Sequence, residues 1–204
     1  MSALPNLWCL VSGVPGVIVG MLINRLLEGL VRPKLACEVI FRFVEHPDSL
    51  FLQTQDGVAE LKYAYHCCVK VTSQHTFLLY FLQKRTLMQL EATLCIDGKQ
   101  FQSIITKTEE PIENIDALPS DSSVDHLHVG GSCYTAYFLI DPINHTTFVL
   151  NPFSGERTVY QKLQGIPKMF WLKLRALHER EYKFQLDLPD TLIERLTARS
   201  SSGA

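Results

Sequence analysis

Positive charge is not in excess in this sequence, and cysteine is scarce. The 19 lysine and arginine residues are outnumbered by 21 aspartate and glutamate residues, so the formal net charge is −2. A general nucleic-acid-binding protein usually has a clear basic excess, so we expect no nucleic acid among the partners. The 6 cysteines in 204 residues are too sparse for a disulfide-stabilised scaffold. With 47% hydrophobic and 20% charged residues, the composition is that of a folded domain.

The motifs of common catalytic and nucleotide-binding sites are missing as well. Gly130 and Gly131 form an isolated pair that no lysine follows, so the chain has no phosphate-binding glycine loop. Nucleophile-elbow, zinc-protease and Cys-x-x-Cys motifs are also absent. The sequence therefore predicts a protein that is not an enzyme, with no catalytic residues and no cofactor.

Residues 1–24 also lack charged side chains, and most of this segment is a long apolar run. Residues 7–23 form a run whose only polar side chain is Ser12. A helix of this length covers about 25 Å, and its extension through Val31 covers a hydrocarbon core of about 30 Å. No basic region precedes the run, and no small-x-small cleavage site follows it closely, so a cleaved signal peptide is not favoured. We predict a retained transmembrane helix; a helix buried in a soluble core is the alternative.

The distribution of basic residues predicts how this helix is oriented. Arg25, Arg32 and Lys34 follow the apolar run, whereas no lysine or arginine precedes it. The positive-inside tendency places the N-terminus outside and the remaining domain in the cytoplasm, where cysteines stay reduced. Trp8 and these three basic residues are the expected anchors at the two membrane interfaces. A reversed topology is the alternative, and its cysteines would be free to oxidise.

Small and polar residues recur along one face of the predicted helix. They are Ser12, Gly13, Gly16, Gly20, Asn24 and Glu28. The Gly16-x-x-x-Gly20 spacing at the centre of this stripe lets two helix backbones approach closely in lipid. The stripe therefore predicts contact with another membrane helix, which is either a second copy of the chain or another subunit.

Beyond Pro33 the helical pattern gives way to alternating apolar and polar residues, which is typical of half-buried strands. The residues predicted to form strands are 35–44, 49–54, 59–71, 76–82, 88–96, 100–105, 133–141, 146–151, 158–163, 170–176 and 182–188. Asp97 and Gly98 predict a type I′ hairpin turn. Strands without intervening long helices indicate an all-β domain, an antiparallel sandwich or barrel of about ten strands.

One short helix is predicted after the strands. It covers residues 191–199, is capped by Asp190, and has Leu192, Ile193 and Leu196 as its apolar face. We therefore divide the chain into three parts. These are an anchor with its basic junction (1–34), a β-sandwich-like domain with an acidic loop at 108–131 (35–189), and a short helix with a frayed tail (190–204).

Two surfaces of the β domain are candidates for contact with a partner. The acidic loop lies in a stretch without lysine or arginine, and its candidate residues are Glu109, Glu110, Glu113 and Asp116. Trp171 lies on the polar row of a predicted strand with Lys173 and Arg175. It is therefore expected either to be exposed as part of a contact patch, or to pack against a loop or the membrane.

The histidines supply only weak candidates for a metal site. In an extended strand His126 and His128 would share one face, with Asp121 or His145 as a third ligand. Histidine pairs at this spacing are common by chance, so no metal site is predicted. His66 lies opposite the apolar row of its strand and is expected to point outward.

These observations predict a single-pass, membrane-anchored and non-catalytic binding or scaffold protein. It would be an accessory subunit of a membrane complex with its β domain in the cytoplasm. Its partners would be membrane lipid and either other membrane subunits or copies of itself. Two alternatives remain open: a homo-oligomeric membrane effector whose β domain senses a signal, and a metal-dependent hydrolase built on His126 and His128.

Overall fold

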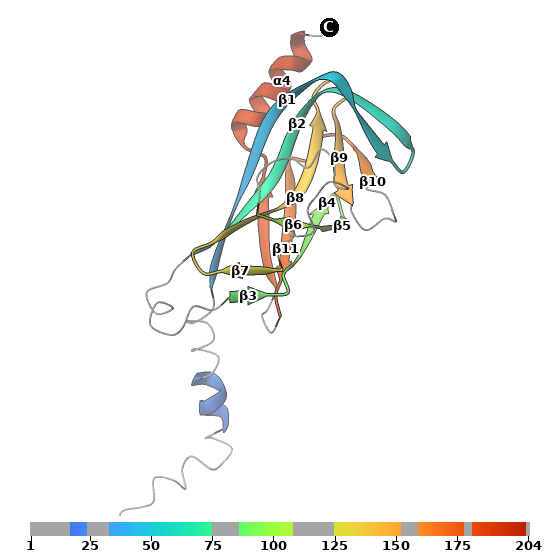
Figure 1. Cartoon of the computed structure of the whole chain (residues 1–204). Coiled ribbons are helices and arrows are strands. Elements are labelled where there is room, and N and C mark those ends of the chain that lie inside the picture. The colour runs from blue at the N-terminus through green and yellow to red at the C-terminus, as the bar shows by residue number, and fades with distance from the viewer. Residues whose placement is uncertain are drawn as a thin grey trace, which may run out of the picture.

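The computed structural model (Figure 1) describes most of the β domain and a short part of the N-terminal segment. The described residues are 17–23, 33–74, 86–107, 125–151, 159–177 and 181–202, with the side chains of Val159 and of residues 198–202 left out. Within these ranges the strands are β1 (Lys34–Thr54), β2 (Gly57–Gln74), β3 (Thr86–Met88), β4 (Glu91–Ile96), β5 (Lys99–Ser103), β6 (Ile105–Thr106), β7 (His126–His128), β8 (Ser132–Asp141), β9 (Thr146–Asn151), β10 (Val159–Gln164), β11 (Met169–Arg175) and β12 (Tyr182–Asp187). One helix, α4 (Asp190–Ser202), follows them. The prediction of an all-β domain is confirmed.

The larger sheet is dominated by the long β1–β2 hairpin, which arches over the top of the domain in Figure 1. The register of the hairpin shifts between Glu45 and Leu50. Pro47 lies in this interval and has no amide hydrogen to donate, and Ser49 adopts a φ of 57°, so the regular ladder is interrupted there. The predicted strands 35–44 and 49–54 are therefore parts of a single bent strand.

This sheet curls back on itself. Its order is β2-β1-β10-β9-β8-β6, and β2 pairs with β8 as well as with β1. The curl is completed by one parallel pair, Thr54 with Tyr160, which joins β1 to β10. A separate apolar cluster is built from strands of this sheet alone: Leu52, Leu61, Ala64, Leu139 and Phe148. The domain therefore combines a curled, nearly closed sheet with a second sheet packed against it.

The second sheet has four strands in the order β12-β11-β4-β5. Asp97 and Gly98 join β4 to β5 with φ values of 49° and 77°, as the predicted type I′ turn requires. The rings of Phe138 in β8 and Phe170 in β11 meet edge to face, with centroids 5.5 Å apart. Both side chains are only 1% exposed, so this contact lies at the centre of the core between the two sheets.

Helix α4 packs on the same core. Leu192 and Leu196 are buried in the main apolar cluster, and Ile193 packs against it. The Arg195 guanidinium lies 5.8 Å from the centre of the Phe41 ring of β1, the strand beside α4 in Figure 1. The predicted apolar face is confirmed, and the helix continues to Ser202, three residues beyond the predicted end.

Two strand predictions need correction, and one falls outside the described residues. The predicted strand 88–96 is divided into β3 and β4 by Gln89, whose φ is 49°. The acidic loop 108–131 contains a strand, β7, that the sequence pattern did not indicate. The predicted strand 76–82 lies outside the described residues.

Of the predicted transmembrane segment, only residues 17–23 are described, and they are helical. No helix within the described residues has both the length and the apolar character needed to cross a membrane. Gly20 faces open space, and Lys34 is the exposed first residue of β1. The remaining predicted membrane residues lie outside the described part of the chain: Trp8, Ser12, Gly13, Gly16, Asn24, Arg25, Glu28 and Arg32.

Candidate functional site

Strands β3 and β7 pair as a small ribbon at one end of the domain (Figure 1). Leu87 and Leu127 face each other in register and are buried, which fixes the inner side of the ribbon. Residues one position away along a strand point to the opposite side. The outer face therefore carries four side chains in two cross-strand pairs: Thr86 with His128, and Met88 with His126.

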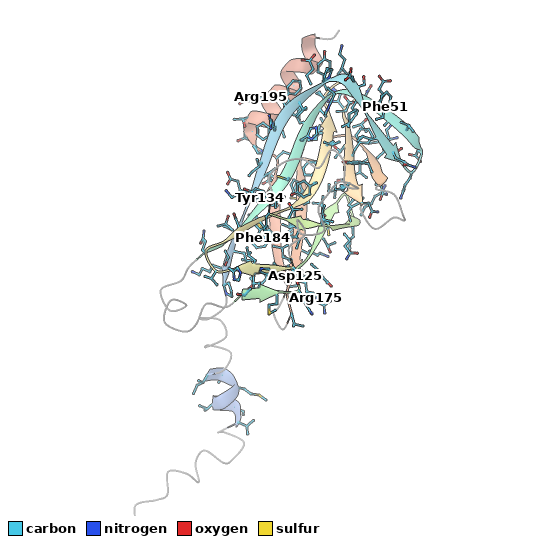
Figure 2. All side chains as sticks on the ribbon, in the orientation of Figure 1. Phe51, Asp125, Tyr134, Arg175, Phe184 and Arg195 are labelled. Carbon is cyan, nitrogen blue, oxygen red and sulfur yellow. The ribbon has the colours of Figure 1, made fainter. Side chains whose placement is uncertain are left out.

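Hydrogen bonds at Nδ1 hold both imidazoles of this ribbon. His126 Nδ1 lies 2.8 Å from Asp125 Oδ1, and the interaction lowers the pKa of the Asp125 carboxyl. The backbone carbonyl of Asp125 accepts a hydrogen bond from Leu90 N, which extends the ribbon by one step. His128 Nδ1 lies 2.9 Å from Thr86 Oγ1. Figure 2 shows Asp125 at the lower end of the domain, near Arg175.

The two imidazoles lie side by side, with centroids 5.0 Å apart and planes at 70°. The prediction that His126 and His128 share one face is therefore confirmed. The chain turns back immediately after them through Gly130, whose φ is 83°. Because both hydrogen bonds use Nδ1, the Nε2 atom of each ring is the one left for a ligand.

The third ligands that the sequence suggested do not complete a metal site. His145 lies in the turn between β8 and β9, at the far end of β8 from His128. This strand has 10 residues, and at about 3.3 Å per residue it separates the two histidines by roughly 30 Å. Asp121 lies outside the described residues. Among the residues that are described, no group of three or more His, Cys, Asp or Glu side chains could hold a metal ion.

A second histidine pair is buried in the larger sheet. His66 in β2 is 5% exposed and His46 in β1 is 8% exposed, so the prediction that His66 points outward is wrong. The reason is that both faces of β2 are covered. Tyr65 and Cys67 join the core against the second sheet, while Ala64, on the same face as His66, joins the cluster built within the curled sheet.

The two buried imidazoles contact each other through their Nε2 atoms, 3.2 Å apart. Burial lowers the pKa of His66 from 6.5 to about 4, with further contributions from His46 and the Arg42 guanidinium. His66 is therefore uncharged near neutral pH, and one of the two rings donates a hydrogen bond to the other. No sequence pattern signals this contact, because the two residues lie 20 positions apart.

Trp171 lies on the outer face of the second sheet, where it is 41% exposed. Along β11 the exposed residues alternate with the buried Phe170, Leu172 and Leu174. Trp171 stands opposite Cys95 of β4 and Gln185 of β12. The row that the sequence predicts is confirmed, and Met169, 45% exposed, extends it.

The acidic candidates Glu109, Glu110, Glu113 and Asp116 lie outside the described residues, so Trp171 is the described member of the predicted partner surface. Its neighbours on the outer face include Met169 and Arg175. Tryptophan, methionine and arginine are enriched in protein–protein interfaces relative to the rest of a protein surface. The chain was also compared with protein families, with curated proteins and with solved structures, and no match was found in any of them.

Proposed function

We propose that this protein is a single-pass, membrane-anchored binding or scaffold protein, an accessory subunit of a membrane complex with its β domain on the cytoplasmic side. The observation that carries the proposal is the exposure of the helical residues 17–23. Their six large apolar side chains are between 51% and 65% exposed: Val17, Ile18, Val19, Met21, Leu22 and Ile23.

The described part of the β domain forms its core without these side chains. The main apolar cluster is built from both sheets and α4, and it takes no residue from 17–23. A helix with apolar side chains all around it is stable only where another apolar environment covers it. These facts favour lipid or another membrane helix as the cover, and they count against a helix buried in the core of this domain.

The experiment is to extract the full-length protein gently from its native membrane and to measure the mass and composition of what co-purifies. The key variant is Gly16→Leu with Gly20→Leu, which fills the small-residue face of the helix. A Cβ at Gly20 meets no atom within 4 Å, so the Gly20 change should leave the β domain intact. We expect the co-purifying assembly to be lost, because two helices can no longer approach closely.

A matched control is Ile18→Phe with Leu22→Phe, which adds bulk to the opposite side of the same helix. The assembly should survive in this control. Unchanged assembly in the glycine variant, or a bare monomer in the wild type, would contradict the proposal. An assembly of identical chains only would instead support the homo-oligomeric effector.

The outer face of the second sheet is the proposed contact surface for a soluble partner. Trp171→Ala should reduce recovery of that partner while leaving contacts made by the membrane helix unchanged. The matched control is Lys183→Ala, on the same face of the neighbouring strand β12. It removes an exposed lysine, a residue type that is depleted in interfaces. Equal recovery of partners by the wild type and the Trp171 variant would show that this face is not the contact surface.

A further inference from the structure

We propose that the outer face of the β3–β7 ribbon is a copper site, with His126 Nε2, His128 Nε2 and the thioether of Met88 as its ligands. This site goes beyond the proposed binding role and does not depend on it. It is built from three side chains that the ribbon places on one face.

The first argument is the arrangement of the two imidazoles. A metal-bound histidine usually donates its other ring N–H to a carboxylate or another acceptor, which fixes the ring and its tautomer. Asp125 Oδ1 is the hydrogen-bond partner of His126 Nδ1, and Thr86 Oγ1 is the partner of His128 Nδ1. When Nδ1 of each ring carries the proton, Nε2 is the free donor atom.

The second argument is the spacing of the rings. Zinc–nitrogen bonds to histidine are about 2.0–2.1 Å long, and with bonds of this length two imidazoles on one ion have ring centroids roughly 5 Å apart. The centroids of His126 and His128 are 5.0 Å apart. The ring spacing therefore fits one shared ion, and binding requires both Nε2 atoms to turn toward it.

The third argument is Met88, which selects the metal. Met88 stands directly opposite His126 in the register of the ribbon, and its side chain is 57% exposed. Directly opposed residues on one face have Cβ atoms about 4.5–5.5 Å apart, which is within reach of a long side chain. Thioether sulfur is a soft ligand that favours Cu(I), and imidazole also suits copper.

The buried pair of His46 and His66 lacks these features. Their Nε2 atoms are already 3.2 Å apart in a mutual contact, and Arg42 brings a positive charge close to His66. A buried cation there would face a like charge without a compensating carboxylate. At the ribbon, the carboxylate of Asp125 supplies the negative charge instead.

The test is a titration of the full-length protein in mild detergent with Cu(I), against a competing chromogenic Cu(I) chelator. All proteins carry Cys9→Ser, which removes the thiol of the N-terminal segment, together with Cys37→Ser and Cys95→Ser, which remove the partly exposed thiols of the β domain, because thiols also bind Cu(I). We expect one Cu(I) per chain. His126→Ala or His128→Ala should weaken the affinity at least tenfold, and Asp125→Ala about tenfold or more through the lost support of His126.

Met88→Leu should weaken Cu(I) binding several-fold and leave Zn(II) binding by the two imidazoles unchanged. X-ray absorption at the copper edge should show a sulfur neighbour in the wild type and none in this variant. The matched controls are His145→Ala and Met169→Leu, an exposed histidine and an exposed methionine elsewhere, and both should bind as the wild type does. The absence of saturable Cu(I) binding would overturn the proposal, as would equal binding by Met88→Leu and wild type.

Discussion

The Nε2 atoms of His46 and His66 lie 3.2 Å apart inside the curled sheet, and both side chains are buried. Two imidazoles in this arrangement share one proton between their facing nitrogens. A further proton on His66 would place a buried positive charge near the Arg42 guanidinium. The uncharged His66 imidazole is therefore part of the folded structure of the β1–β2 hairpin.

The stability of the domain should fall as the pH falls from about 6.5 to about 4. The pKa of His66 is about 4 in the folded protein and 6.5 when the group is unperturbed, so in this interval the unfolded chain binds more protons than the folded one. Stability therefore rises with pH across the interval. The stabilisation that the uncharged His66 contributes is fully present above pH 6.5. The difference is on the order of 3 kcal/mol, and denaturant unfolding measured across this pH range should detect it.

The variant that checks this assignment is His66→Gln, which does not titrate. It should lose most of the pH dependence in this interval, whatever its stability at neutral pH. His145→Gln removes an exposed histidine and should keep the wild-type slope. A His66→Gln protein with the wild-type slope would show that another group controls the transition.

Phe170→Ala should destabilise the domain by about 3–5 kcal/mol, because it leaves a cavity where the two sheets meet. Phe170 is 1% exposed and contacts the Phe138 ring edge to face. The neighbouring change Trp171→Ala, on the outer face of the same strand, should cost about 1 kcal/mol or less. Urea unfolding of the full-length protein in detergent measures both. Similar costs for the two changes would show that the alternation along β11 does not separate core from surface.

Among the cysteines of the β domain, Cys95 should react first with an alkylating reagent near neutral pH. Burial raises the pKa of Cys37 to about 12 and of Cys133 to about 11, and it also raises the pKa of the fully buried Cys67. The thiolate is the reactive form, so the raised pKa keeps all three thiols protonated, and Cys67 and Cys133 are also protected by their burial, whereas Cys37 is partly exposed. Cys95 is partly exposed beside Trp171.

Mass spectrometry of peptides after timed alkylation identifies the reacting thiol. The experiment is done in a Cys9→Ser protein, so that the N-terminal segment does not contribute. Denatured protein provides the control, because all five remaining thiols should then react at similar rates. Reaction of Cys67 or Cys133 at the rate of Cys95 in the native protein would contradict the burial of these side chains.

The features that the sequence predicted correctly depend on neighbours in the chain. The alternation in β11 separates buried Leu172 from exposed Trp171 because successive residues of any strand point to opposite sides. Asp97 and Gly98 adopt positive φ because glycine has no Cβ to clash and aspartate tolerates the left-handed region better than most residues. The same local argument explains the apolar face of α4, since residues three or four positions apart lie on one side of a helix.

Other features depend on which strands meet, and only the tertiary structure decides them. His66 is buried because the larger sheet curls and covers the second face of β2, and alternation alone cannot show this. Met88 joins His126 because β3 pairs with β7 across 38 positions of sequence. Periodicity determines on which side of a strand a residue lies. The long-range hydrogen bonds and apolar contacts of the folded chain determine which other residues lie opposite that residue.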